Sequence, residues 1–315
     1  MRLLVTGGAG FIGSNFVHYI LGKYPDHEVI DLDALTYAGS LGNLEGLMDN
    51  PRHRFVQGRI EDGKLVAELM EGVDVVINFA AESHVDRSIL EPQVFIKTNV
   101  VGTQVLLDAA LQYKVGLFYQ ISTDEVYGAL ELNSTERFTE HSPLRPNSPY
   151  AASKTSADLL VRAYHRTYGL PVVISRCSNN YGPRQHSEKF IPTVILNALH
   201  DKPIPIYGDG LYVRDWIHVL DHCRAIDLIM NKGKIGEVYN IGHDNEWANI
   251  DLARKILQIM GKPEDLLQSV TDRPGHDRRY ALDNDKLKRE FDWKPSISFD
   301  HGLAETVRWY TEGGK

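Results

Sequence analysis

The sequence predicts an α/β fold in which a doubly wound parallel sheet is followed by a smaller C-terminal domain. Three observations support this prediction. Short β-branched runs alternate with longer amphipathic stretches through the first half of the chain, which is typical of repeated βαβ units. The β-branched runs are nearly all apolar, as expected for strands buried on both faces. A glycine-rich turn joins the first run to the first amphipathic stretch.

The strands expected in the first half are short and rich in Val and Ile. They cover Leu3–Thr6, Glu28–Leu32, Arg54–Gln57, Val73–Asn78, Leu117–Ser122 and Pro171–Arg176. The helices expected between them repeat apolar residues with a helical period. They cover Phe11–Tyr24, Gly63–Met70, Phe95–Tyr113 and Ser148–Tyr168. This order predicts a parallel sheet with helices on both faces.

Gly and Pro interrupt the second half of the chain more often, at Asn180–Pro183, Lys202–Pro205 and Arg273–Gly275. Further helices are expected over Phe190–Leu199, Asp221–Met230, Ile250–Met260 and His301–Tyr310. We predict one domain over 1–176, which also receives segments from about 212–242, and a second domain over 177–315.

Composition limits the function classes. The 315 residues include 34 Lys and Arg against 42 Asp and Glu, a net charge of −8, which argues against a nucleic-acid backbone or an anionic membrane as main partner. The two cysteines, Cys177 and Cys223, exclude a disulfide scaffold and fit a reducing cytosol. No uncharged apolar run approaches the ~20 residues that span a bilayer. We expect a soluble cytoplasmic protein.

The turn after the first strand reads Gly8-Ala9-Gly10-Phe11-Ile12-Gly13, with Gly7 before it. It matches G-x-G-x-x-G, follows an apolar strand, opens a helix, and is followed about twenty residues later by Asp33 at the end of the next strand. Glycines let a pyrophosphate approach the backbone, and the helix N-terminus holds its charge. Asp33 would accept hydrogen bonds from the adenosine ribose and repel a 2′-phosphate. The turn therefore predicts NAD rather than NADP; a structural turn without a ligand is the alternative.

Tyr150 and Lys154 are spaced i, i+4 on an expected helix and so project from one face. A neighbouring ammonium and the positive nicotinamide of NAD would both favour the phenolate and lower the pKa of Tyr150. The pair could then remove a proton from a substrate hydroxyl. A surface Tyr and Lys on an ordinary helix is the alternative, which the glycine turn disfavours.

Thr123, Asp124 and Glu125 follow an expected strand at its carboxyl end, where α/β sheets bind ligands. Adjacent carboxyl groups supply an acid and a base, which oxidation and re-reduction at a single carbon does not require. The alternative is that the two carboxylates cap the turn.

These motifs resemble the extended short-chain dehydrogenase/reductase family that acts on nucleotide-activated sugars, and the similarity runs from Arg2 to about Tyr280. Within that family, four longer motifs, at 81–88, 122–128, 176–183 and 273–280, resemble the dTDP-glucose 4,6-dehydratases. The resemblance implies a Rossmann NAD-binding domain, a second domain that mainly binds nucleotide sugar, and dTDP-glucose as the substrate.

The resemblance also implies a role for each catalytic residue. Tyr150, with Lys154, takes the proton of the C4 hydroxyl while NAD takes the C4 hydride, and Thr123 hydrogen-bonds the C4 oxygen. The ketone acidifies the C5 hydrogen, which Glu125 removes, and a neutral Asp124 protonates the departing C6 hydroxyl. Hydride return to C6 gives a 4-keto-6-deoxy sugar. Burial and the Glu125 charge are expected to raise the pKa of Asp124.

The ligand contacts rest on the same resemblance. The implied cofactor residues are Gly7, Gly10, Phe11, Ile12, Gly13, Asp33, Ala34, Leu35, Thr36, Ile60, Ala80, Ala81, Ser83, Thr98, Tyr150, Lys154 and Asn180. The implied substrate residues are Ser83, Thr123, Asn179, Lys189, Phe190, Pro205, Tyr207, Arg214, Asn249, Arg273 and His276. The histidines lack metal-ligand spacing, so no metal is expected.

The match departs from the family at Arg59, where an Asp usually accepts a hydrogen bond from the adenine amino group. Stacking of Arg59 on adenine, or substitution by Glu61 or Asp62, are the alternatives. A homodimer through helices at Val100–Tyr113 and Ser153–Tyr168 is implied by resemblance. Three other functions stay open: a UDP-sugar 4,6-dehydratase, a nucleotide-sugar 4-epimerase, which Asp124 and Glu125 disfavour, and a non-enzymatic NAD-binding scaffold.

Overall fold

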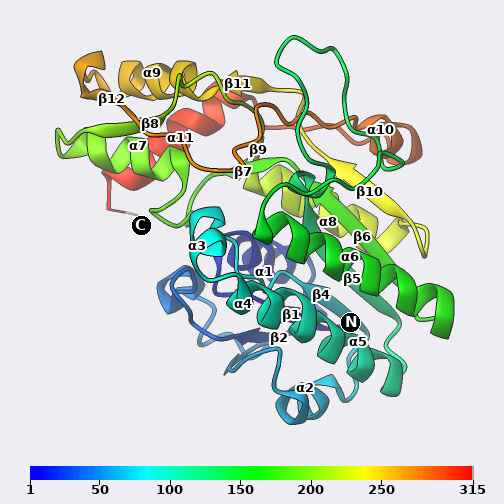
Figure 1. Cartoon of the computed structure of the whole chain (residues 1–315). Coiled ribbons are helices and arrows are strands. Elements are labelled where there is room, and N and C mark those ends of the chain that lie inside the picture. The colour runs from blue at the N-terminus through cyan, green and yellow to red at the C-terminus, as the bar shows by residue number, and fades with distance from the viewer. Residues whose placement is uncertain (314–315) are drawn as a thin grey trace.

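A parallel sheet of seven strands forms the centre of the molecule, in the order β10-β6-β5-β4-β1-β2-β3 (Figure 1). The structure is a computed structural model and describes residues 1–313. The strands are β1 (Arg2–Thr6), β2 (Glu28–Asp33), β3 (His53–Gln57), β4 (Val75–Asn78), β5 (Leu117–Thr123), β6 (Val172–Cys177) and β10 (Val238–Ile241). The strand order reverses between β1 and β4, and ligands of such sheets bind at this switch point, beyond the carboxyl ends of the strands.

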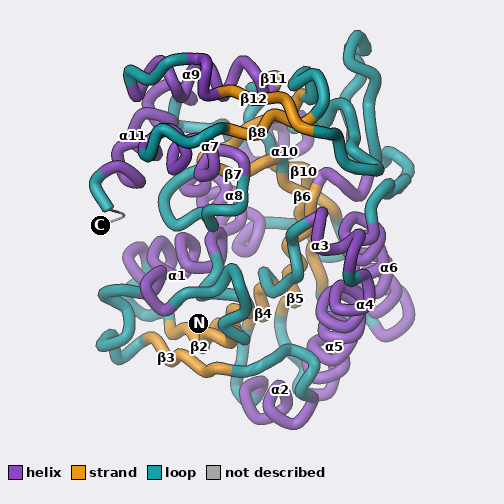
Figure 2. Tube along the Cα trace, turned by 60° about the vertical axis from the view of Figure 1, so that its left-hand side comes forward, coloured by secondary structure: helices purple, strands orange, loops and turns teal. Residues whose placement is uncertain are grey.

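Helices cover both faces of this sheet, as the alternating pattern predicts (Figure 2). The helices of this part are α1 (Phe11–Lys23), α2 (Gly63–Met70), α3 (Val85–Leu90), α4 (Pro92–Phe95), α5 (Thr103–Gln112), α6 (Pro149–Tyr168), α8 (Val219–Lys232) and α10 (Asp285–Phe291). Helices α1 and α8 pack on one face around Phe16 and Ile226. Helices α2, α5 and α6 pack on the other face around Val66, Leu107 and Val161.

A second, smaller assembly lies beyond the carboxyl ends of the central strands. Its strands are β7 (Asn179–Tyr181), β8 (Ile204–Tyr207), β9 (Val213–His218), β11 (Glu246–Ala248) and β12 (Leu267–Val270). Its helices are α7 (Phe190–Leu199), α9 (Asn249–Met260) and α11 (Phe299–Thr311). They enclose a separate core that includes Ile195, Trp216 and Leu303. These strands were not predicted, because each is only three to six residues long and carries little periodicity.

The chain returns to the central sheet after β9. Helix α8 packs against α1, and β10 pairs in parallel with β6 from Val238 opposite Ile174 to Ile241 opposite Cys177. These contacts support a boundary near residue 176 with a returning segment from the second half, and we propose this division into domains.

The predicted helix Phe95–Tyr113 is wrong as a single regular helix. A π-helical segment, Ile96–Gly102, separates α4 from α5. In this segment the Asn99 side chain accepts a hydrogen bond from the Glu82 backbone N–H and donates to the Ser153 hydroxyl, at 2.9 and 2.8 Å. π-Helical turns are frequent at functional sites, and this one ties the loop after β4 to α6.

The run Pro92–Gln112 is long and apolar enough to cross a membrane by length and composition, and 44% of its most apolar window is buried inside the molecule. It carries Lys97 and Asp108 and packs against α2 and α6, as a helix covering a sheet does.

Candidate active site

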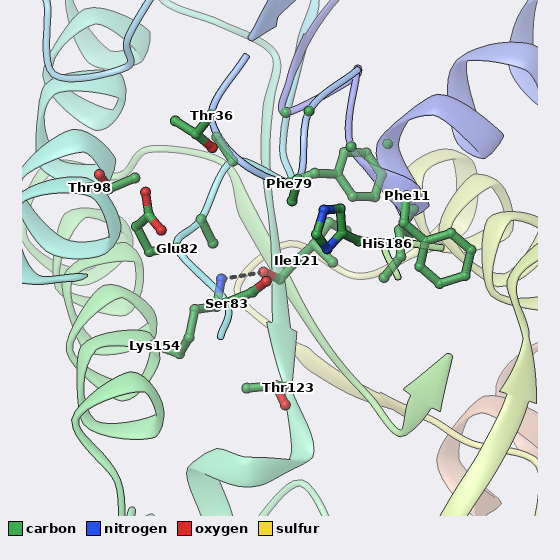
Figure 3. A pocket seen from close by; sticks show the side chains of 18 of the residues that line it. Phe11, Thr36, Phe79, Glu82, Ser83, Thr98, Ile121, Thr123, Lys154 and His186 are labelled. Atoms are coloured by element: carbon green, nitrogen blue, oxygen red, sulfur yellow. Dashed lines mark hydrogen bonds between the residues drawn. The ribbon is translucent and has the colours of Figure 1, made fainter. Parts of the chain in front are cut away.

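A cavity opens at the carboxyl ends of the central strands and is shared between the two assemblies (Figure 3). Its walls come from the glycine turn, the loops after β2, β3 and β4, the end of β5, the start of α6 and residues 177–189. All five residues predicted to be catalytic line it: Thr123, Asp124, Glu125, Tyr150 and Lys154. Every predicted cofactor residue except Leu35 lines it as well. The structure therefore brings at least seven segments of the sequence to one site.

The glycine turn has no room for side chains. Gly7 has a φ of 75°, and a Cβ there would lie 2.7 Å from the Ala80 nitrogen. A Cβ on Gly13 would lie 2.2 Å from the Gly7 carbonyl oxygen. Helix α1 begins at Phe11 without a side-chain cap, so no side chain accepts from its first N–H groups. A helix start with these properties suits a pyrophosphate.

Asp33 closes the neighbouring strand, as predicted. Its carboxylate accepts hydrogen bonds from the backbone N–H groups of Ala9 and Leu35, at 2.9 and 2.8 Å. Leu35 therefore holds the Asp33 side chain in place and does not itself line the cavity. Each carboxylate oxygen retains a second lone pair, so Asp33 can still accept from a ribose.

Tyr150 and Lys154 project from the first turns of α6, which Ser148 caps by accepting from the Ala151 N–H at 3.1 Å. The Lys154 ammonium is buried and donates to the Ile121 carbonyl oxygen at 2.7 Å (Figure 3). Burial lowers the pKa of Lys154, and burial together with the Glu125 charge raises the pKa of Tyr150 well above its usual range. The predicted lowering of the Tyr150 pKa includes the positive charge of bound nicotinamide, and it stays a prediction for the protein with NAD bound.

Asp124 and Glu125 begin a short 3₁₀ turn, Asp124–Tyr127, and Thr123 caps it. The Thr123 hydroxyl accepts from the Glu125 N–H at 3.2 Å and donates to one Asp124 oxygen at 3.3 Å. The alternative in which the two carboxylates serve as the cap is therefore wrong, since Thr123 does this. The other Asp124 oxygen, Oδ2, is buried without a hydrogen-bond partner among the described residues. A buried carboxyl oxygen without a hydrogen-bond partner disfavours the charged form of Asp124 and so favours its protonated form.

Burial separates the two carboxyl groups chemically. It raises the pKa of Asp124 well above its ordinary value, and the Glu125 charge adds to this effect. Burial also raises the pKa of Glu125, but the cations of Arg273, Lys189 and Arg214 oppose it. Asp124 thus holds its proton more strongly than Glu125, which is the arrangement of an acid beside a base.

The comparisons with known proteins agree with this geometry. The profile described as GDP-mannose 4,6 dehydratase matches residues 4–306. The chain belongs to this family. It is 54% identical over 310 residues to the low-salt glycan biosynthesis protein Agl12 of Haloferax volcanii, covering 98% of each chain. It is 52% identical to a dTDP-glucose 4,6-dehydratase of Streptomyces antibioticus, covering 99% of this chain and 93% of that protein. The structure of DesIV, the dTDP-glucose 4,6-dehydratase of Streptomyces venezuelae, was solved with NAD and TYD bound. It superposes on this chain with a TM-score of 0.97 and is 54% identical in sequence. The match covers 99% of this chain and 98% of that one.

In this member of the GDP-mannose 4,6 dehydratase family, the predicted substrate residues fall into two groups. Those that line the cavity are Ser83, Thr123, Asn179 and Lys189. Those outside its wall are Phe190, Pro205, Tyr207, Arg214, Asn249, Arg273 and His276. Several of the second group lie close together, since Tyr207 is edge-on to His276 at 6.0 Å.

Two of these residues contact the first domain. Arg273 pairs with Asp86 of α3 at 3.3 Å, and the Tyr207 hydroxyl donates to the same carboxylate at 3.4 Å. The Arg273 Nε is buried and has no partner among the described residues. Arg214, in contrast, is already engaged, because its guanidinium donates to the Asp277 carbonyl oxygen at 2.8 Å and lies over the Tyr280 ring.

The sequence reasoning assigned no ligand contact to the cavity residues Glu82 and His186 (Figure 3). Glu82 and His186 adjoin motifs that were recognised, so their neighbourhood was the available signal. No set of three or more His, Cys, Asp or Glu side chains within residues 1–313 is arranged to hold a metal.

Replacing Asp124 by Asn is expected to stabilise the protein in a pH-dependent way. Because the folded-state pKa of Asp124 is raised, the folded state binds more protons than the unfolded state between the two pKa values. Stability therefore falls as the pH rises through that window, and Asn removes this loss. We expect Tm to increase by roughly 2–4 °C at pH 7 and the gain to shrink toward pH 4, measured by calorimetry. A gain that is equal or larger at acid pH would contradict this assignment.

Proposed function

We propose that this protein converts dTDP-glucose to dTDP-4-keto-6-deoxyglucose and water, with bound NAD as its cofactor. The observation that carries the proposal is the pair Asp124 and Glu125 on the cavity wall, with one Asp124 oxygen buried and unpartnered and the capping role taken by Thr123. The similarity to dTDP-glucose 4,6-dehydratases, DesIV among them, supports the same reaction.

The residues present fit NAD. The cradle at Gly7 and Gly13, which a Cβ would fill, suits a pyrophosphate, and Asp33 suits an adenosine ribose without a 2′-phosphate. Bound NAD supplies an acceptor for the C4 hydride and the donor that returns a hydride to C6. The DesIV and Bacillus anthracis structures, both solved with NAD, support this assignment.

The adenine contact is proposed to fall to Glu61 rather than Asp62. Glu61 lines the cavity and accepts from the Thr98 hydroxyl at 3.1 Å. Asp62 instead caps α2, accepting from the backbone N–H groups of Lys64 and Leu65. Arg59 also lines the cavity, and stacking of its guanidinium on the base stays the alternative contact.

We assign the proton transfers to the chain's own side chains. Tyr150 takes the C4 hydroxyl proton as the phenolate and becomes a neutral phenol. The Lys154 ammonium, held by the Ile121 carbonyl oxygen, favours the phenolate that must be present before this step. Glu125 removes the proton at C5, which the C4 ketone has acidified, and Asp124 gives its proton to the C6 hydroxyl, which leaves as water. Glu125 then returns its proton to C5 as the hydride returns to C6, so the substrate loses one water overall. The cycle closes when Tyr150 releases its proton to solvent and Asp124 takes one up.

The diphosphate of the substrate is proposed to lie between Lys189 and Arg273. The Lys189 ammonium donates to the Ser83 carbonyl oxygen at 3.0 Å and retains two donors. Arg273 retains the unpartnered Nε. Pro205 and Tyr207 point to the same side of β8, where they would border the base.

Mass spectrometry tests the reaction directly. Incubation with dTDP-glucose is expected to give a product lighter by one water. An unchanged mass with inverted C4 would favour the 4-epimerase, and an unchanged substrate beside bound NAD would favour the scaffold. UDP-glucose in a parallel incubation distinguishes the two nucleotides, and we expect slower turnover.

Gly13→Ala is expected to weaken NAD binding at least tenfold. The added Cβ would lie 2.2 Å from the Gly7 carbonyl oxygen and would force the turn away from α1. Gly22→Ala, in the same helix, is the matched control, because its Cβ would meet no atom within 4 Å. Titration calorimetry should show at least a tenfold weaker Kd for Gly13→Ala only, while Gly22→Ala stabilises the helix by about 1 kcal/mol.

A homodimer is proposed through the outer faces of α5, α6 and the segment before α5. Large apolar side chains are exposed there, including Val101 at 44%, Leu159 at 51% and Tyr168 at 57%. Such a patch favours a second copy of the chain as its partner. Light scattering should give twice the chain mass, and Leu159→Glu should shift it toward the monomer while Leu211→Glu, on the second domain, should not.

We also propose a cytoplasmic location, which the two buried free thiols support.

A further inference from the structure

A chain of buried polar groups joins the turn that carries Asp124 and Glu125 to the helix that carries Tyr150 and Lys154. We infer that Tyr127 and Arg176 in this chain are positioning residues for the elimination of water. This inference rests on the proposed function and adds residues to which that proposal gives no role.

The contacts run from the end of the turn to the middle of α6. The Arg176 Nη1 donates to the Tyr127 hydroxyl at 3.0 Å, and the Arg176 Nε donates to Asp158 of α6 at 3.0 Å. The Tyr127 hydroxyl donates in turn to Asn240 of β10 at 2.8 Å. Asp158 follows Lys154 by four residues, so the two side chains lie on one face of α6.

The side chains of this polar network are deeply buried, which fixes their geometry. The exposed fractions are 2% for Tyr127, 5% for Arg176, 1% for Asp158 and 0% for Asn240. A buried charge whose partner is removed is strongly unfavourable, so Arg176 and Asp158 hold each other in one arrangement. The Tyr127 ring is also fixed, stacked on Phe138 with ring centroids 5.0 Å apart.

The other end of the turn is held by backbone contacts. Gly128 has a φ of 86°, and a Cβ there would lie 2.4 Å from the Arg145 carbonyl oxygen. The Arg145 N–H donates to the Val126 carbonyl oxygen at 3.0 Å. Contacts therefore hold the turn at both ends. The Tyr127 hydroxyl connects it, through Arg176, to Asp158 of α6.

The reaction explains why such a link matters. Tyr150 acts at C4 of the sugar, whereas Glu125 and Asp124 act at C5 and C6. The Tyr150 oxygen and the carboxyl groups of Asp124 and Glu125 must therefore be spaced to reach neighbouring carbons of one sugar. A misplacement of about 1 Å can reduce a rate about a hundredfold. Loosening the turn should slow elimination and leave oxidation at C4 intact, because Tyr150 and Lys154 keep their own contacts.

Tyr127→Phe tests this role by removing a single oxygen atom. On mixing with dTDP-glucose, we expect product formation to be slowed about tenfold or more and the absorbance of the reduced nicotinamide to build up, while the bound cofactor content stays at the wild-type level. Arg176→Lys keeps the charge beside Asp158 but cannot form the fork that reaches both partners, and it should give the same signature. It serves as the second variant if Tyr127→Phe folds poorly.

Tyr239→Phe is the matched control. This tyrosine has a fully buried ring and lies next to Asn240 in β10. Its hydroxyl donates to Glu290 and accepts from the Lys234 backbone N–H, and it does not contact Tyr127, Arg176 or Asp158. It should lose stability without any build-up of reduced nicotinamide. If the wild-type protein dehydrates dTDP-glucose and Tyr127→Phe behaves like it, or loses both half-reactions equally, the positioning role is refuted alone. If the wild-type protein leaves dTDP-glucose unchanged, the proposed function fails and the positioning role with it.

Discussion

Glu125→Gln is expected to stop the release of water while still allowing substrate to reduce the bound cofactor. Glutamine has the shape of glutamate but cannot accept the C5 proton, so elimination should fall by about a thousandfold or more. Oxidation at C4 depends on Tyr150 and Lys154, whose contacts do not involve the Glu125 side chain. Rapid mixing with dTDP-glucose should show the absorbance of reduced nicotinamide rising and persisting, with little keto-deoxy sugar by mass spectrometry.

The same variant separates the two roles of the carboxyl pair. Removing the Glu125 charge also removes one cause of the raised pKa of Asp124, although burial remains the larger cause. Asp124 should therefore stay protonated at neutral pH. If Glu125→Gln releases water at the wild-type rate, the base has been assigned to the wrong residue.

Tyr150→Phe is expected to block the first step as well as the overall reaction. Phenylalanine keeps the ring beside Phe95 and Val85 but has no oxygen to take the C4 proton. We expect turnover to fall by about a thousandfold, with no reduced nicotinamide after mixing. Without a ketone at C4 the C5 hydrogen is not acidified, so elimination fails too.

The two variants thus predict opposite absorbance changes from a similar loss of product. Cofactor content, measured after denaturation, should equal that of the wild-type protein in both, which excludes a loss of binding. Reduced nicotinamide in Tyr150→Phe would show that another group takes the first proton.

The sequence predicted the central fold well where periodicity was strong. The apolar runs became the six parallel strands β1 to β6, and the amphipathic stretches became helices on both faces. Three features escaped prediction. The segment Ile96–Gly102 is π-helical and lets Asn99 accept from the Glu82 backbone N–H, a contact that hydrophobic periodicity does not predict. The short strands of the second assembly and the register of β10 on β6 depend on long-range contacts, although the return of a segment from about 212–242 was predicted.

The candidate site divides in the same way. The glycine turn, Asp33 and the Tyr150–Lys154 spacing carry local signals, and the structure places them together at one cavity. The upward shift of the Tyr150 pKa in the protein without NAD could not be predicted, because burial and the Glu125 charge cause it and neither is visible in the Tyr150–Lys154 spacing. Tyr127 and Arg176 were missed as positioning residues, since 49 residues separate them along the chain.

The late arrival of β10 has a consequence for synthesis. Until the ribosome has delivered Val238–Ile241, the outer edge of β6 has no strand to cover it, and the α1 face lacks Ile226 and Ile229 of α8. A nascent or truncated chain ending near residue 176 would expose an unpaired strand edge beside apolar surface. Such an edge can pair with another copy of the chain. Cells that make this protein must keep roughly the first three-quarters of each copy apart from its neighbours while it is being translated.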